Sequence, residues 1–290
     1  MRDLRPDPIS SAHTRGVQRA WDGDRDKGDA PSLGASMPEA SGTADGPPGA
    51  GGRRKLAFVH IPKTAGTSFT QALRIGWPCA KVVATQAQFD AVNDDDIANI
   101  DLIAGHFHAY CLEDRRFLAF DRVTVLRDPF ERLFSAYRFG RDAVAAGVEV
   151  GPAMRLAAET TFGDWAFSRF GLAQPHSHLW LLGLNADDQP SRVSFAHLLA
   201  QAKARLDRMH VGIVDCLDDF VGYLFRHYGL TGPAFVARMN ITRRYDPEEA
   251  GLTATQKSEL MDLLRPDYEL YAYGRALMQQ RMEVQSRVLA

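Results

Sequence analysis

Residues 60–68, with the sequence HIPKTAGTS, combine a lysine, a glycine and several hydroxyl side chains. If this stretch joins a strand to a helix, the backbone N–H groups at the start of the helix form a site for an anion. Gly66 lets the backbone approach that anion closely, and Lys63 adds a mobile positive charge. The lysine precedes the only glycine, so the stretch is not a Walker A motif, in which the lysine follows the second glycine. The residues therefore predict an anion site of another kind, with an ordinary turn and a solvated lysine as the alternative for this stretch taken alone.

A second stretch with anion-binding residues covers 127–137, RDPFERLFSAY. Arg127 follows an apolar run, and Ser135 lies two turns into the helix predicted after it. A guanidinium and a hydroxyl that converge from a strand end and a helix can hold one phosphate group. Arg132 and Arg138 add positive potential nearby. The alternative is that Arg127 pairs with an acidic neighbour and that Ser135 is a small residue packed within a helix.

Apolar runs predict the strands that bring these two stretches together. The run at 56–61 is nearly continuous, which is typical of a strand buried on both faces. Strands that alternate with helices indicate an α/β fold with a mainly parallel sheet, and such sheets bind ligands at the carboxyl ends of their strands. The predicted strands are 56–61, 81–84, 101–104, 122–126 and 209–214.

Capping signals mark the start of the helix that follows Arg127. Asp128 suits the N-cap, Pro129 the first helical position and Glu131 the third, as in a variant of the capping box. The other predicted helices are 67–75, 217–228, 253–264 and 266–282, with helical segments over 150–206 that are broken at Gly163, Gly171 and Pro175.

Composition divides the chain of 290 residues into a tail and a folded part. Between residues 23 and 54 the only large apolar residues are Leu33 and Met37. Such a segment cannot bury enough surface to offset its ordering entropy. We therefore expect residues 1–54 to be a disordered tail and residues 55–290 to form one domain.

Charge and cysteine content exclude several classes of partner. The formal net charge of −2 argues against general nucleic-acid binding, which needs a basic surface. The 3 cysteines share no short spacing, which argues against a zinc site or a disulfide framework. The sequence has no evident secretory signal and no apolar run long enough to span a bilayer. We expect a cytoplasmic protein with no bound metal and no integral membrane association.

Together the two anion-binding stretches resemble the sulfotransferases that use 3′-phosphoadenosine 5′-phosphosulfate (PAPS). The resemblance is strongest to the carbohydrate branch, which contains heparan sulfate 2-O-sulfotransferase and bacterial relatives. Residues 58–69 are similar to the 5′-phosphosulfate loop of that family, and residues 125–135 to its 3′-phosphate element. The resemblance covers roughly residues 56–275 and implies a P-loop-NTPase-like sheet flanked by helices, with PAPS as cofactor.

This resemblance implies a role for each residue of the two stretches. Lys63 would contact the bridging oxygen of the phosphosulfate. Arg127 and Ser135 would hold the 3′-phosphate, which distinguishes PAPS from ATP. The residues that would hold the 5′-phosphate are Thr64, Ala65, Gly66, Thr67 and Ser68.

A histidine completes the expected catalytic pair. Gly105-His106 resembles the step at which the 2-O-sulfotransferase-like enzymes place their catalytic base. A neutral imidazole is a natural base near pH 7, so we expect His106 to take the proton of the acceptor. A second histidine often precedes that glycine in the family, whereas this chain has Ala104 there. His108 is the alternative base, or a contact for the acceptor.

Two later stretches carry further candidates. Asn240 and Arg243 resemble a late segment of the family that lies near the cofactor, for which a polar loop is the alternative. His176 and His178 could face the acceptor, although a plain surface loop is the favoured interpretation.

The expected reaction is in-line transfer of a sulfuryl group from PAPS to an acceptor hydroxyl, on a carbohydrate, with release of 3′-phosphoadenosine 5′-phosphate (PAP). Lys63 would stabilise the negative charge that develops on the bridging oxygen. Amine, phenol and peptide acceptors remain open. One alternative function is a kinase or NTPase with a degenerate phosphate loop, for which Asp128 is the nearest candidate magnesium ligand. The other is a non-catalytic glycan- or nucleotide-binding protein on the same fold.

Removal of the predicted tail tests the assignment of domains. A chain that begins near Arg53 should melt at a similar temperature to the full chain and keep its activity, because the composition of the tail cannot build a core. Thermal unfolding and turnover of the two chains are the measurements. Loss of folding in the shortened chain would place part of the domain before residue 54.

Overall fold

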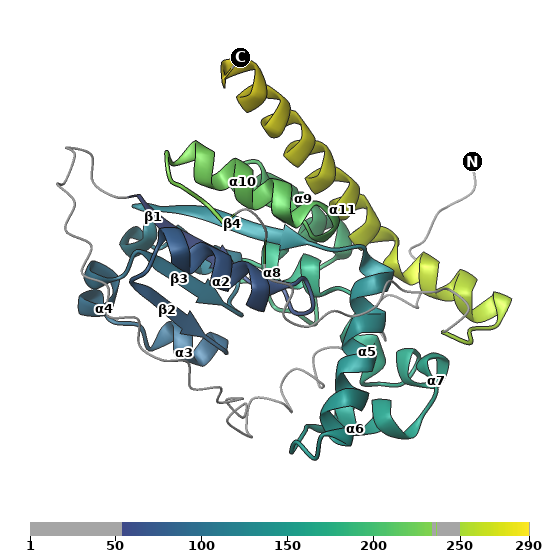
Figure 1. Cartoon of the computed structure of the whole chain (residues 1–290). Helices are drawn as coiled ribbons and strands as arrows, with labels where there is room; N and C mark the ends of the chain where they lie inside the picture. Colours follow the sequence, from purple (N-terminus) through teal and green to yellow (C-terminus); the bar gives the residue numbers. More distant parts are fainter. Residues whose placement is uncertain (1–53, 234–235, 237–249, 290) are drawn as a thin grey trace.

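A sheet of five parallel strands forms the centre of the described part of the protein (Figure 1). The computed structural model describes residues 54–233, 236 and 250–289. The strands lie in the order β2-β3-β1-β4-β5, so the first strand occupies the middle. Their bounds are β1 (Lys55–Val59), β2 (Ala80–Val83), β3 (Leu102–Gly105), β4 (Phe120–Leu126) and β5 (His210–Ile213).

The position of β1 determines which segments meet at the carboxyl edge of the sheet. Val59 pairs with Gly105 of β3 on one side and with Thr124 of β4 on the other. The Thr124 hydroxyl also donates a hydrogen bond to the Val59 carbonyl at 2.9 Å. The chain segments that follow β1, β3 and β4 therefore leave the sheet side by side.

Several helices pack around this sheet and share one core with it. The helix α2 (Gly66–Gly76) packs on β3 and on α10 (Leu217–His227). The helix α9 (Phe195–Leu206) packs on α8 (Ser177–Gly183) and on α11 (Ala254–Leu289), which in turn packs on β5. Shorter elements are α3 (Gln86–Asp90), α4 (Asp94–Asn99), and the 3₁₀ helices η1 (Ala109–Glu113), η2 (Arg115–Phe117), η3 (Gly171–Ala173) and η4 (Val214–Cys216).

A second, smaller core lies to one side of the sheet (Figure 1). It joins α5 (Pro129–Ala145), α6 (Pro152–Glu159) and α7 (Phe162–Ala166) to the first part of α11. Because α5 begins directly after β4, its first turns link the second core to the carboxyl edge of the sheet.

The predicted start of α5 is confirmed. Asp128 is the N-cap and accepts the N–H of Glu131 at 3.0 Å, and Pro129 is the first helical residue. The Glu131 carboxylate lies 3.4 Å from Nε of Arg127. Glu131 therefore forms an ion pair with Arg127 in place of the second capping-box hydrogen bond, which would run from the backbone N–H of Asp128 to the Glu131 carboxylate. This cap fixes the direction in which the chain leaves β4.

All five predicted strands are confirmed to within two residues at each end. The helical state predicted for 253–264 and 266–282 is confirmed, but the predicted break between them is wrong, because α11 runs without interruption through Pro266. Buried side chains anchor it on both sides of the proline, Leu264 in the second core and Leu270 in the first. Packing thus outweighs the lost backbone hydrogen bond, and Figure 1 shows the helix changing direction along its length.

The prediction of a helix break at Gly163 is also wrong, because this residue lies inside α7. The interruption falls just before it, where the Thr161 hydroxyl caps the helix by accepting the N–H of Asp164. The short helices α3 and α4 were not predicted. Each begins at a polar N-cap, Thr85 and Asn93, which is the signal that the sequence offers for them.

The observed architecture confirms the predicted α/β class, with a parallel sheet flanked by helices and the first loop in a P-loop-like position after the central strand. Among the described helices, none is both long and apolar enough to cross a membrane.

Candidate functional site

The loop between β1 and α2 has an unusual backbone. Lys63 and Ala65 both have positive φ angles, 69° and 60°, which side chains other than glycine adopt uncommonly. Between them, the buried Thr64 hydroxyl donates to the Ile61 carbonyl at 2.8 Å. Ala65 is the N-cap of α2 and provides no side-chain cap. The N–H groups of the first turn of α2 are therefore presented at the carboxyl edge, as an anion site requires.

A histidine ring explains why a glycine follows Ala65. A Cβ atom added at Gly66 would lie only 1.8 Å from Nε2 of His60. His60 in turn donates its backbone N–H to the Gly105 carbonyl at 2.8 Å, which ties the end of β1 to the end of β3. Close packing of His60 against Gly66 thus sets the position of the loop relative to the sheet.

Lys63 projects from the loop toward α5. Its Nζ lies 3.8 Å from the centre of the Phe139 ring, a cation–π contact. Burial, followed by the positive charge of Arg127, lowers the pKa of Lys63 to about 8, although the carboxylate of Asp142 opposes this change. Lys63 is thus an ammonium group held close to another cation, an arrangement that an anion between them would relieve.

Arg127 connects the two predicted phosphate-binding stretches directly. Its Nη1 donates to the Lys63 carbonyl at 3.4 Å, and its Nε faces the Glu131 carboxylate at the same distance. Its side chain is only 12% exposed. Ser135, the other residue of the predicted 3′-phosphate element, is buried in α5. The structure therefore places Arg127 and Lys63 side by side, as the order of the strands requires.

His106 lies at the end of β3 and stacks on His60, with ring centres 4.2 Å apart. Its Nδ1 is 2.7 Å from the His60 carbonyl, which can only accept a hydrogen bond. The neutral ring must therefore carry its proton on Nδ1, which leaves the lone pair on Nε2. Burial lowers the pKa of His106, with a further contribution from the Lys63 charge, while the bond to the His60 carbonyl acts in the opposite sense. The ring is thus kept neutral near pH 7 and can act as a base through Nε2.

The remaining loop residues differ in accessibility. Thr67 is exposed at the start of α2, whereas Ser68 is almost buried. His108 is half-buried, with Nδ1 lying 3.2 Å from the Trp180 carbonyl and its backbone N–H donating to Gln86. His108 therefore faces α8, whereas His106 faces the loop after β1.

The interpretation of residues 174–178 as a surface loop is wrong. His176 and His178 are each 1% exposed, and both contact the buried carboxylate of Asp267 on α11. Their imidazoles face the interior because a fully buried carboxylate must be paired there. Asn240 and Arg243 lie outside the described residues.

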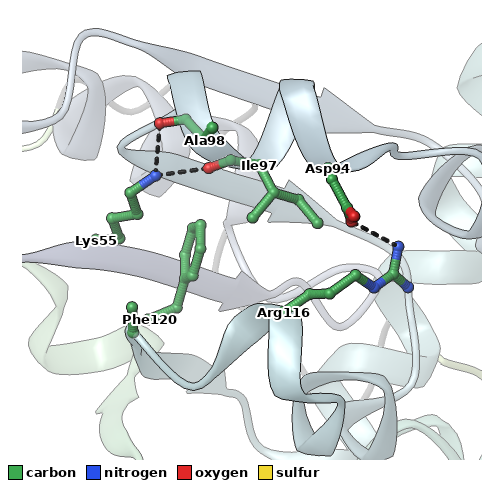
Figure 2. A pocket seen from close by; sticks show the side chains of 7 residues that line it. Lys55, Asp94, Ile97, Ala98, Arg116 and Phe120 are labelled. Atoms are coloured by element: carbon green, nitrogen blue, oxygen red, sulfur yellow. Dashed lines mark hydrogen bonds and ion pairs between the residues drawn. The ribbon is translucent and has the colours of Figure 1, made fainter.

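A separate pocket lies at the opposite edge of the sheet and does not share these features. Figure 2 shows it at the amino ends of β1 and β4, where Lys55 and Phe120 begin the two strands. Lys55 donates to the carbonyls of Ile97 and Ala98 at 2.6 and 2.9 Å, so its charge stabilises the last turn of α4. The charged groups of this pocket thus serve the fold. Within the described ranges, no cluster of three or more His, Cys, Asp or Glu side chains could hold a metal ion.

Sequence reasoning missed four residues at the carboxyl edge. His60 was part of the first stretch, but its contact with His106 joins residues 46 positions apart and leaves no local pattern. Phe139 follows Ser135 by four residues and lies on the same side of α5, a spacing that offered a signal. The other two are the acidic residues Glu131 and Asp142, which act on Arg127 and Lys63.

Comparison with known proteins gave a match to a family model and matches to solved structures. The model of the sulfotransferase family matches residues 51–274. Among solved structures, a sulfotransferase from Alicyclobacillus acidocaldarius aligns with a TM-score of 0.45 and 14% identity, over 78% of this chain and 96% of that chain. No curated protein matches this chain significantly.

The packing of Gly66 against His60 gives a prediction for stability. Gly66→Ala should lower the free energy of unfolding by about 1–3 kcal/mol, because the added methyl group overlaps the imidazole. Urea unfolding of both single variants and of the double variant with His60→Ala measures the coupling. In the His60→Ala background, Gly66→Ala should cost much less. An equal cost in both backgrounds would show that the ring is not what excludes a side chain at residue 66.

Proposed function

Because the chain belongs to the sulfotransferase family, we propose that it transfers a sulfuryl group from PAPS to an acceptor hydroxyl and releases PAP. The observation that carries this proposal is the contact between the first loop and Arg127, whose Nη1 lies 3.4 Å from the Lys63 carbonyl. This contact brings the guanidinium of Arg127 next to the loop that carries Lys63 and the uncapped N-terminus of α2, a set of groups that suits a ligand with phosphate groups at two positions.

The first loop and the start of α5 divide the binding of PAPS between them. Residues 64–68 would hold the 5′-phosphate through backbone N–H groups and the Thr67 hydroxyl, since the Thr64 hydroxyl is bonded to Ile61. Arg127 and Ser135 would hold the 3′-phosphate. Asn240 and Arg243 would add contacts to the nucleotide. PAPS supplies the sulfuryl group and the leaving group of the reaction.

Two side chains would act on the reacting atoms. His106 would accept the proton of the acceptor hydroxyl at Nε2, because Nδ1 is held by the His60 carbonyl. Lys63 would place its ammonium group on the oxygen that bridges phosphorus and sulfur, where negative charge grows as the bond to sulfur breaks. His60 would orient His106 through the stacked ring and the carbonyl.

A carbohydrate hydroxyl is the proposed acceptor, on the strength of the resemblance of residues 58–69 and 125–135 to the carbohydrate branch. The kinase alternative loses its candidate magnesium ligand, because Asp128 caps α5 and also accepts the Tyr268 hydroxyl at 3.1 Å.

Ligand-induced stabilisation tests the proposed cofactor. PAP should raise the melting temperature far more than ADP, since only PAP carries the 3′-phosphate for Arg127. At about 100 times its Kd, PAP should add about 2.7 kcal/mol to the free energy of unfolding. Arg127→Ala should remove most of this preference, whereas Arg155→Ala on α6, an equal change in charge, should not. Equal stabilisation by PAP and ADP in the unmodified chain would contradict the proposal.

Turnover of two variants tests the proposed chemistry. Lys63→Ala should lower kcat by roughly 10²–10³-fold, the range for removal of one preorganised charge-stabilising donor. His106→Ala should lower kcat by roughly 10²–10⁴-fold, the range for a general base. PAP affinity should remain measurable in both variants, because the 3′-phosphate contacts are kept. Near-normal turnover of His106→Ala would point to His108 as the base.

The pH profile of kcat/KM provides the control for these assignments. His106 must be neutral to accept a proton, so activity should fall only as the pH drops through a value below the ordinary histidine range. Lys63 must be protonated, so activity should also fall as the pH rises through about 8. In Lys63→Arg, whose guanidinium stays charged, the alkaline fall near pH 8 should disappear. An unchanged alkaline limb in that variant would assign it to another group.

A further inference from the structure

A buried cluster of ionisable side chains lies beneath the start of α5, outside the proposed catalytic pair. Asp267 of α11 and Arg132 of α5 are both 0% exposed, and His176 and His178 are each 1% exposed. Burial of so many ionisable groups is costly unless each has a defined partner. The partners of these groups therefore indicate which part of the structure the cluster stabilises.

His178 connects this cluster to Arg127. Its Nε2 accepts the backbone N–H of Arg127 at 3.5 Å, and its Nδ1 lies 3.6 Å from Oδ1 of Asp267. A backbone N–H can only donate, so Nε2 must carry the lone pair and Nδ1 the proton. Burial lowers the pKa of His178 and so favours this neutral form. The Asp267 carboxylate lies 3.6 Å from Nδ1, beyond hydrogen-bonding distance, but its negative charge favours a proton on Nδ1 and so favours the tautomer whose Nε2 can accept the N–H of Arg127.

The other contacts of Asp267 hold it in place for this task. Its Oδ2 lies 2.5 Å from Nδ1 of His176, the residue that precedes α8. Arg132 donates to the carbonyls of Gln174 and Pro175, which joins α5 to the same segment. His176 thus holds the Asp267 carboxylate at the start of α8, and Arg132 ties the segment before α8 to α5.

The next residue of α11 makes a second contact with the same junction. The Tyr268 hydroxyl donates to Oδ1 of Asp128 at 3.1 Å, and the same oxygen accepts the N–H of Glu131. Asp267 and Tyr268 are consecutive on α11, and the residues that they hold, Arg127 and Asp128, are the two that connect β4 to α5. One acts through His178 on Arg127, and the other acts directly on Asp128.

We propose that Asp267, His178 and Tyr268 are positioning residues that hold the Arg127 peptide so that its guanidinium can receive the 3′-phosphate. This inference rests on the proposed function. Within the described ranges, the side chain of Arg127 makes polar contacts of 3.4 Å, to Glu131 and to the Lys63 carbonyl. Fixing its backbone therefore reduces the freedom that the guanidinium would lose when it binds a phosphate.

Substitutions at His178 distinguish the contact of Nδ1 with Asp267 from the contact of Nε2 with the Arg127 N–H. The amide of His178→Asn occupies the place of Nδ1 and can still meet Asp267, but it cannot reach the Arg127 N–H. The amide of His178→Gln occupies the place of Nε2 and keeps an acceptor for that N–H. Asp267→Asn and Tyr268→Phe test the partners on α11. Asp262→Asn, an exposed carboxylate on the same helix, is the matched control.

The experiment measures the affinity of each variant for PAP and for AMP, which lacks only the 3′-phosphate, by titration calorimetry. His178→Asn and Asp267→Asn should weaken PAP binding by about threefold to tenfold, the effect of one hydrogen bond, and leave AMP binding unchanged. His178→Gln should recover most of the affinity for PAP, and Tyr268→Phe, which loses one hydroxyl, should lose about twofold to fivefold. The KM for PAPS should rise in parallel while kcat at saturation stays within about twofold.

Each outcome decides between the proposals. If PAP and AMP bind the unmodified chain equally, the proposed function fails. If PAP is preferred and His178→Asn, Asp267→Asn and Tyr268→Phe all keep that preference, the positioning role is overturned. Equal losses for PAP and AMP would assign the cluster to the core alone and also overturn it. If the variants at the buried positions do not fold, Tyr268→Phe decides by itself, because it removes one partly buried oxygen and no charge.

Discussion

The parallel pairing of β1 with β3 on one side and β4 on the other is the constraint on which the candidate site depends. Because Val59 pairs with both Gly105 and Thr124, β1 and β3 end at one level of the sheet and β4 ends two residues further on, so the three segments that follow leave the same edge. Lys63, His106 and Arg127 come from these three segments. The His60 backbone then ties the first segment to the second, and Arg127 ties the third to the first.

This arrangement brings positive charges together at an energetic cost that a ligand can reverse. Arg127 lowers the pKa of Lys63 and of the fully buried Arg132, whose pKa falls to about 10 chiefly through burial. Acidic side chains compensate only in part: Glu131 lies 3.4 Å from Arg127, and Asp142 raises the pKa of Lys63. Because the cations are already held close together, binding of the proposed anion would require little reorganisation and would relieve repulsion that is already present.

Local signals in the sequence predicted the parts of the fold that short segments determine. Apolar runs gave the strands, and Asp128-Pro129 gave the start of α5. The sequence did not predict features that depend on distant partners. His176 and His178 are buried because Asp267 lies about 90 residues further along the chain, and α11 continues through Pro266 because both cores hold it. The contact between His60 and His106 likewise spans two strands and has no periodic signature.

The proposed base, His106, and the proposed charge-stabilising group, Lys63, affect each other electrostatically. The positive charge of Lys63 lowers the pKa of both His106 and His60, after the larger effect of burial. A protonated Lys63 therefore favours the neutral imidazole that can accept a proton. In the proposed reaction, His106 would become a cation near Lys63 when it takes the proton of the acceptor, and the repulsion between the two charges would favour release of that proton to solvent after the transfer. In the same proposed reaction, the neutral His106 would accept the proton of the acceptor while Lys63 would stabilise the charge on the leaving oxygen, so one electrostatic arrangement would serve both bond formation and bond cleavage.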